Sequence, residues 1–98
     1  MDAAKQIEEA KQAETLTLIV FYADWSPHYE WIEPIVHTFE KPVSIIRVNI
    51  EGDKKVAEAY GIDIAPSFVL QRKDRILWEK TGEVFPGELK DVIEMFKD

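Results

Sequence analysis

The chain of 98 residues is 46% apolar and 32% charged and contains no cysteine, which fits one small folded domain over residues 1–98 and leaves no room for a second. Nineteen acidic residues against twelve basic ones give a formal net charge of −7. A basic surface that follows nucleic-acid phosphates is therefore not expected. The lack of cysteine excludes disulfides, thiolate nucleophiles, iron–sulfur clusters and cysteine-ligated zinc.

Neither a targeting segment nor a membrane span is evident in the sequence. Residues 1–6 carry no positive flank ahead of an apolar stretch, which a secretory signal would need. The longest apolar run, residues 18–23, is far shorter than the roughly 20 residues of a membrane helix. We therefore expect a cytoplasmic protein that does not bind membranes, unless a leader has been removed from the chain.

The N-terminal part of the chain predicts a helix followed by a buried strand. Residues 2–14 place Ala3, Ile7 and Ala10 at helical spacing, which is typical of a short helix with a narrow apolar face. Residues 16–23 are β-branched, aromatic and almost uncharged. That pattern is typical of a strand whose two faces are both covered, so helices are expected on both sides of the sheet.

Ser26-Pro27 combines two residue types that begin helices. A serine oxygen can accept a hydrogen bond from a free N–H of the first turn, and proline at the first helical position gives up a donor that would be unpaired. We expect a helix from Ser26 to about Glu40, with Pro34 inside it breaking one backbone hydrogen bond and bending the helix.

The rest of the chain predicts a strand, a helix, a hairpin and a closing helix. Residues 43–50 are typical of a second buried strand, and residues 53–60 of a short helix that ends at Gly61. Two strands, residues 67–71 and 75–80, flank the charged pair Lys73-Asp74 and predict an antiparallel hairpin. The final helix is expected to begin at Pro86, and its apolar positions follow helical spacing: Leu89, Val92, Ile93 and Phe96.

Residues 21–29, with Trp25-Ser26-Pro27-His28-Tyr29 at their end, resemble the active-site segment of the thioredoxin family, where an aromatic strand ends in Trp followed by Cys-x-x-Cys. Further segments follow in the family's order: Pro34, residues 48–50, 60–62 and 64–67, Thr81-Gly82 and residues 87–90. The resemblance covers roughly residues 16–96. It implies an α/β thioredoxin-like fold with a mixed four-stranded sheet, helices on both faces and a cis-proline loop at Pro66, without the family's extra N-terminal strand.

The sequence departs from the family at the residues that carry its redox chemistry. Ser26 and Tyr29 stand where the family has its two cysteines, and Val20 and Arg47 stand where the reductases have a buried acid and its basic partner. A serine hydroxyl does not exchange disulfides at neutral pH, and a tyrosine cannot resolve a mixed disulfide. The degenerate active-site positions Ser26, Pro27, His28 and Tyr29 therefore predict a descendant that is not a redox enzyme.

The resemblance also implies a peptide-binding groove, formed by Trp25, Ala65, Pro66 and Gly82. In the family this edge receives an extended peptide by short β-like pairing. Our leading interpretation is a module that binds an extended peptide or protein weakly, without a cofactor. The alternatives are a thiol–disulfide oxidoreductase by homology, with residual or lost activity in cell redox homeostasis, and a structural or oligomerising domain. The sequence does not predict the partner or the oligomeric state.

Two other kinds of site are disfavoured. A Ser26-His28 hydrolase would need the two side chains to meet, whereas side chains two positions apart on a helix diverge. No third group is evident to orient the histidine. A metal site at His28, with Asp24, Glu30 and Glu33 nearby, would lack the second histidine. His37 lies nine residues along the expected helix, roughly 13 Å away.

Overall fold

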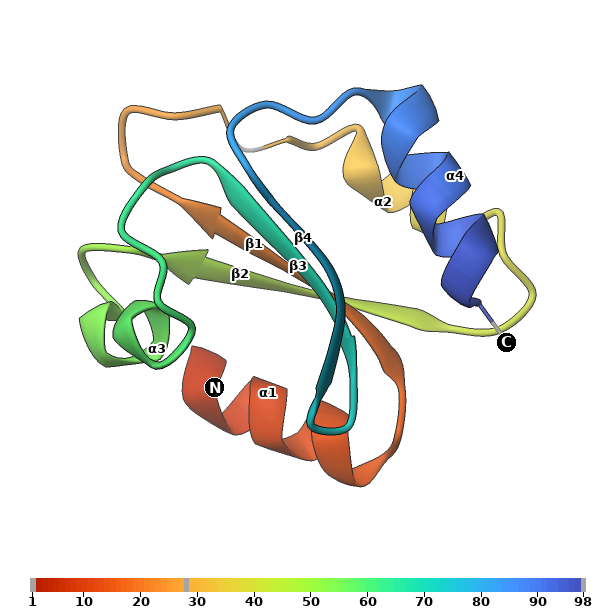
Figure 1. The fold of residues 1–98 in the computed structure, drawn as a ribbon, viewed down its shortest axis with the longest axis horizontal. Helices are drawn as coiled ribbons and strands as arrows, with labels where there is room; N and C mark the ends of the chain where they lie inside the picture. The colour runs from red at the N-terminus through yellow and green to blue at the C-terminus, as the bar shows by residue number, and fades with distance from the viewer. Residues whose placement is uncertain (1, 28, 98) are drawn as a thin grey trace.

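Four strands form one mixed sheet in the computed structural model, which describes residues 2–27 and 29–97. They are β1 (Leu16–Tyr22), β2 (Val43–Asn49), β3 (Ser67–Arg72) and β4 (Arg75–Thr81), in the spatial order β2-β1-β3-β4. β1 pairs parallel with β2 and antiparallel with β3, and β3 pairs antiparallel with β4 (Figure 1). The predicted mixed four-stranded sheet is confirmed.

Helices cover both faces of the sheet, as the sequence predicts. α1 (Ala3–Gln12) and α3 (Lys54–Ala59) lie on one side, and α2 (Ile32–Val36) and α4 (Pro86–Phe96) lie on the other (Figure 1). Each face has its own apolar core, one packed against α2 and α4 and the other against α1 and α3. None of the described helices is both long and apolar enough to cross a membrane.

β1 is the buried centre of the sheet. Leu18 and Val20 belong to the core under α2 and α4, whereas Ile19 and Phe21 belong to the core under α1 and α3. Because successive side chains of a strand point to opposite faces, a strand that feeds two cores has no position for a charge. This explains the uncharged run in the sequence and confirms the expected strand to within one residue.

The second helix is much shorter than predicted. The sequence analysis expected a helix from Ser26 to about Glu40, whereas α2 spans only Ile32–Val36. Tyr29 has a φ of 55°, which lies outside the right-handed helical region, so the helix cannot begin before it. The predicted bend at Pro34 is also wrong: this residue lies in the first turn of α2, where its missing N–H would have no helical partner.

The other turn and helix signals are confirmed. Gly61 has a φ of 68° and its N–H donates to the Glu58 carbonyl, which ends α3 in a left-handed cap. Lys73-Asp74 joins β3 to β4, with Lys73 at a positive φ. Pro86 is the first residue of α4. These positions are set by backbone requirements within a few residues, which is why local sequence predicts them.

Two residues of α4 offer a direct measure of the core under this helix. Ile93 is fully buried there, whereas Met95, two positions along, is 73% exposed. We expect Ile93→Ala to lower the free energy of unfolding by about 2–4 kcal/mol, because it removes buried methylenes and leaves a cavity. Met95→Ala should change it by less than about 0.5 kcal/mol. Urea denaturation of both variants tests this, and equal losses would contradict the assigned packing of α4.

Candidate functional site

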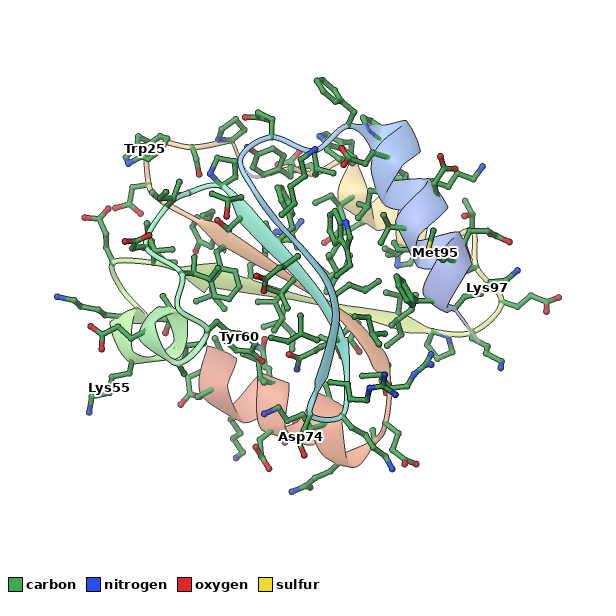
Figure 2. The ribbon with its side chains drawn as sticks, viewed as in Figure 1. Trp25, Lys55, Tyr60, Asp74, Met95 and Lys97 are labelled. Atoms are coloured by element: carbon green, nitrogen blue, oxygen red, sulfur yellow. The ribbon has the colours of Figure 1, made fainter. Side chains whose placement is uncertain are left out.

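Three loops leave the sheet at the same end, and each of them carries one or two of the predicted groove residues. Phe21 near the end of β1 pairs with Ser67, the first residue of β3, and Ser67 pairs with Thr81, the last residue of β4. The loops after β1, before β3 and after β4 therefore leave the sheet side by side. We call them the loop edge: residues 23–27, 29–31, 60–66 and 82–85. They carry Trp25, Ala65-Pro66 and Gly82, and Trp25 lies at the opposite end of the molecule from Asp74 (Figure 2).

The Ser26 hydroxyl is occupied within its own loop. Its Oγ accepts a hydrogen bond from the Ala23 N–H at 3.0 Å and donates to the Ala23 carbonyl at 2.9 Å, and Ser26 is buried. The predicted role of Ser26 as a helix cap is wrong, because α2 begins only at Ile32. The hydroxyl instead closes the turn that follows β1, and its proton is already donated to a backbone carbonyl.

Tyr29 packs in the core and is tied to a distant loop. Its ring makes edge contacts with Phe68 and Trp31, at centroid distances of 5.5 and 6.2 Å. Its hydroxyl donates to Glu83 Oε1 at 3.0 Å. Burial, and then the hydrogen bond and negative charge of Glu83, raise the pKa of Tyr29 to about 12. Tyr29, which stands at the family's second cysteine position, therefore helps to stabilise the fold. Of the other two positions, Pro27 is exposed and His28 lies outside the described residues.

The proline loop combines a buried cis bond with unpaired backbone groups. The Ala65–Pro66 peptide bond is cis, as the resemblance implied. The Pro66 carbonyl accepts from the Gly82 N–H at 2.8 Å, which joins two loops of the loop edge. Gly82 has a φ of 97°, a conformation that suits glycine. The N–H and C=O of Ala65 form no hydrogen bond with any described residue, so a strand-like partner has groups to pair with.

One asparagine fixes the loop that carries Trp25. The Asn49 amide donates to Asp24 Oδ1 at 2.8 Å, and its oxygen accepts from the N–H groups of Glu51 and Gly52 at 2.9 and 3.1 Å. These bonds connect the loop after β1 to the loop after β2. The residue directly before Trp25 is thus held in place by a hydrogen bond, which fixes the backbone on the N-terminal side of Trp25.

Two large apolar residues of the loop edge were missed by the sequence analysis. In the described part of the chain, Trp25 is 71% exposed, Ile64 55% and Phe85 71%. Ile64 directly precedes Ala65-Pro66, and Phe85 directly precedes the proline that opens α4. The available signal was a large apolar side chain at a loop position, outside any helical or strand periodicity. The three residues come from three different loops and belong to neither core.

Val20 and Arg47, which stand where the reductases have a buried acid and its basic partner, lie on neighbouring strands. Val20 is a buried side chain in β1, in register with Arg47 of β2. The Arg47 guanidinium lies 3.4 Å from Glu33 Oε1 at the surface. No buried carboxylate therefore faces the Ser26 loop from this position. Among the described residues there is also no group of three or more histidine, aspartate or glutamate side chains placed to hold a metal ion.

The sheet order, the helices on both faces and the cis-proline loop define a thioredoxin-like fold. The structure resembles that of a single-site mutant of the thioredoxin from Halobacterium salinarum, with a TM-score of 0.78 and 25% sequence identity. The match covers 96% of this chain and 85% of that one. The fold class that the sequence predicted is therefore confirmed.

The chain belongs to the thioredoxin family, whose sequence model matches residues 2–95. It is 26% identical over 91 residues to a thioredoxin of Buchnera aphidicola from Acyrthosiphon pisum, which spans 89% of this chain and 84% of that protein. It is 30% identical over 87 residues to an H-type thioredoxin of Fagopyrum esculentum, spanning 82% of this chain and 75% of the relative. Because the chain contains no cysteine, it has no dithiol of the kind that the resemblance would imply.

Removing the Tyr29 hydroxyl should weaken the tie between its loop and Glu83. Tyr29→Phe keeps the ring contacts with Phe68 and Trp31 and removes only the hydrogen bond. We expect the free energy of unfolding at neutral pH to fall by about 1 kcal/mol. Glu83→Gln is the matched variant, since an amide oxygen still accepts the bond without a charge, and its loss should be smaller. Urea denaturation measures both variants. A free energy of unfolding of Tyr29→Phe equal to that of wild type would contradict this role.

The raised pKa of Tyr29 predicts a difference between wild type and Tyr29→Phe at high pH. Folding favours the neutral phenol, so its contribution to stability is complete below the unfolded pKa of 10.0 and is lost as the pH rises through about 12. Wild type should therefore lose stability over this range that the variant does not lose. Urea unfolding of both proteins at each pH measures this. If the free energies of unfolding of wild type and Tyr29→Phe depend on pH in the same way, the assignment is contradicted.

Proposed function

We propose that this chain is a thioredoxin-family protein that binds an extended peptide segment at the loop edge and performs no dithiol chemistry. The observation that carries the proposal is the gathering of Trp25, Ile64 and Phe85 on three adjoining loops. Large apolar side chains left exposed on neighbouring loops are available for contact with a partner. Trp25 offers the largest apolar area and an indole N–H that can bond to a peptide carbonyl.

Backbone groups support an extended form for the bound segment. The unpaired N–H and C=O of Ala65 can exchange hydrogen bonds with one residue of a passing strand. A Cβ placed on Gly82 would meet no atom within 4 Å, so the space beside this glycine is open to a second chain. A peptide that crosses from Trp25 past Ala65 to Gly82 would meet apolar area and free backbone groups in turn.

The residues at the former cysteine positions support binding without covalent chemistry. A chain without cysteine has no thiolate to attack a disulfide. Ser26 is engaged with Ala23, and the first turn of α2 begins at Ile32, so no helix N-terminus lies at Ser26 to stabilise an anion there. Binding therefore depends on non-covalent contacts, and we expect dissociation constants of about a micromolar or weaker.

The charge of the protein supports a preference among peptides. With a formal net charge of −7, basic and neutral peptides are favoured over acidic ones, and binding of basic peptides should weaken as salt rises. Glu83 stands on the loop edge and adds a carboxylate there, held by the Tyr29 hydroxyl.

The relatives named above are thioredoxins by name, which favours descent from redox enzymes and makes a test of that activity necessary. We expect no reduction of insulin disulfides by the protein in the presence of dithiothreitol beyond that of dithiothreitol alone, because no thiolate starts the exchange. The control is the same protein after heat inactivation. Turnover above that control would contradict the proposal.

Trp25→Ala should weaken peptide binding at least about fivefold, because it removes the largest exposed apolar surface of the loop edge. The probe is a set of fluorescently labelled, lysine-containing peptides of about ten residues, long enough to cross the edge when extended. Met95→Ala on α4 is the matched control, since Met95 is also exposed, at 73%.

Fluorescence anisotropy titrations of wild type and both variants measure the effect. Phe85→Ala should also weaken binding, since Phe85 extends the same surface. Equal affinities of wild type and Trp25→Ala, or a loss with Met95→Ala alone, would remove the loop edge as the binding site.

A further inference from the structure

Glu83 lies where the three loops of the loop edge are joined to one another. Its side chain reaches the loop after β1, because Oε1 accepts the hydrogen bond of the Tyr29 hydroxyl at 3.0 Å. Its backbone follows Gly82, whose N–H donates to the Pro66 carbonyl of the proline loop at 2.8 Å. Glu83 is thus one residue beyond this bond, and Ala65 is one residue before it. A segment that pairs with the backbone of Ala65 passes close to the Glu83 carboxylate.

The Glu83 carboxylate is exposed and yet held in place. Its hydrogen-bond donor has little freedom to move, because the Tyr29 ring is buried and makes edge contacts with Phe68 and Trp31. The bond occupies Oε1, and Oε2 has no hydrogen-bond partner among the described residues. A carboxylate accepts several hydrogen bonds, so Oε2 remains able to accept one from a cation of a bound segment.

Among residues 2–27 and 29–97, no cation pairs with Glu83. The loop edge itself contains neither lysine nor arginine. Lys80, three positions before Glu83 in the sequence, donates to both carboxylate oxygens of Glu88 at 2.8 Å. The charge of Glu83 is therefore available to a partner.

An exposed aromatic residue follows this charge in the chain. Phe85, two positions after Glu83, is 71% exposed. Lysine and arginine carry their charge at the end of an apolar stem, and such side chains lie along apolar surface with the charged group in a polar place. A carboxylate followed by an exposed ring suits both parts of such a side chain. An acidic side chain would instead be repelled by Glu83.

We propose that Glu83 makes the loop edge selective for a segment that carries a lysine or arginine, and that Tyr29 positions the Glu83 carboxylate for this contact. The inference rests on the peptide binding proposed above and assigns its charge preference to one residue. The net charge of the protein also favours cations, but it acts at a distance and does not depend on any single carboxylate. The two causes can therefore be separated by substitution.

The hydrogen bond from Tyr29 explains how an exposed carboxylate can contribute to selectivity. An exposed ion pair usually contributes little, because two long side chains lose freedom when they meet. Glu83 is already restricted by Tyr29 in the free protein. Less freedom is lost on binding, so more of the attraction remains as affinity. Tyr29 is thus a positioning residue, whereas Glu83 contacts the bound cation.

Paired peptides measure this selectivity. The probes are fluorescently labelled, otherwise uncharged peptides of about ten residues with one central lysine. Each is matched by the same peptide with acetyl-lysine, which removes the charge and keeps the stem. Fluorescence anisotropy gives the ratio of the two dissociation constants. We expect wild type to bind the lysine form about fivefold more tightly, and a ratio below about two would overturn the proposal.

Two glutamate substitutions separate the contact from the net charge. Glu83→Gln should bring the ratio to about one, because the amide keeps the size of the side chain and loses its charge. Glu8→Gln is the matched control: Glu8 is exposed on α1, and its substitution changes the net charge by the same amount. This control should keep the ratio of wild type. Equal ratios in the two variants would overturn the proposal, since the net charge would then be the cause.

Tyr29→Phe tests the positioning role. We expect the ratio to fall to about two, because Glu83 keeps its charge but loses the bond that restricts it. A purely structural effect of Tyr29 would weaken binding of the lysine and acetyl-lysine peptides alike and leave their ratio unchanged. An unchanged ratio would therefore overturn the role assigned to Tyr29.

Trp25→Ala separates this inference from the proposed function. If Trp25→Ala weakens binding of both peptides while Glu83→Gln keeps the ratio of wild type, the loop edge binds peptides and the selectivity assigned to Glu83 is wrong. If neither peptide binds to wild type, or if Trp25→Ala leaves both affinities unchanged, the peptide site itself is wrong and the selectivity is overturned with it.

Discussion

Everything else in the molecule is positioned by the burial of β1 on both faces. Its alternating side chains feed two separate cores, so α1 and α3 must cover one side of the sheet and α2 and α4 the other. Its two edges are used by β2 and β3, which fixes which strands are left at the outside. Its carboxyl end also decides where the loop edge forms, because Phe21 pairs there with the start of β3.

The sequence predicts the parts of this structure that depend on local chemistry. Uncharged β-branched residues mark β1, Gly61 marks the end of α3, and Pro86 marks the start of α4. The length of α2 could not be predicted, because Ser26-Pro27 is a sound helix start by local rules. The positive φ of Tyr29 overrides them, and its hydroxyl partner Glu83 lies 54 residues away. Ile64 and Phe85 were missed for a similar reason, since only the fold brings their loops together.

The loss of the dithiol is accompanied by a change in what the two positions do. Ser26 holds the turn after β1 through Ala23, and Tyr29 fills the core against Phe68. Both residues now support the fold, whereas the exposed apolar residues that could contact a partner lie around them. A site with this division can change its exposed binding residues without disturbing the packing of Ser26 and Tyr29.

The order of strand pairing also has a consequence for how the chain is made. Phe21 in the central strand pairs with Ser67, so β1 lacks one of its two neighbours until about two thirds of the chain has left the ribosome. Until β3 is available, an apolar strand with an open edge is exposed to other nascent chains. Contacts distant in sequence also slow folding, because a long loop must close before they form. The strand that organises the finished protein is thus its main liability during synthesis.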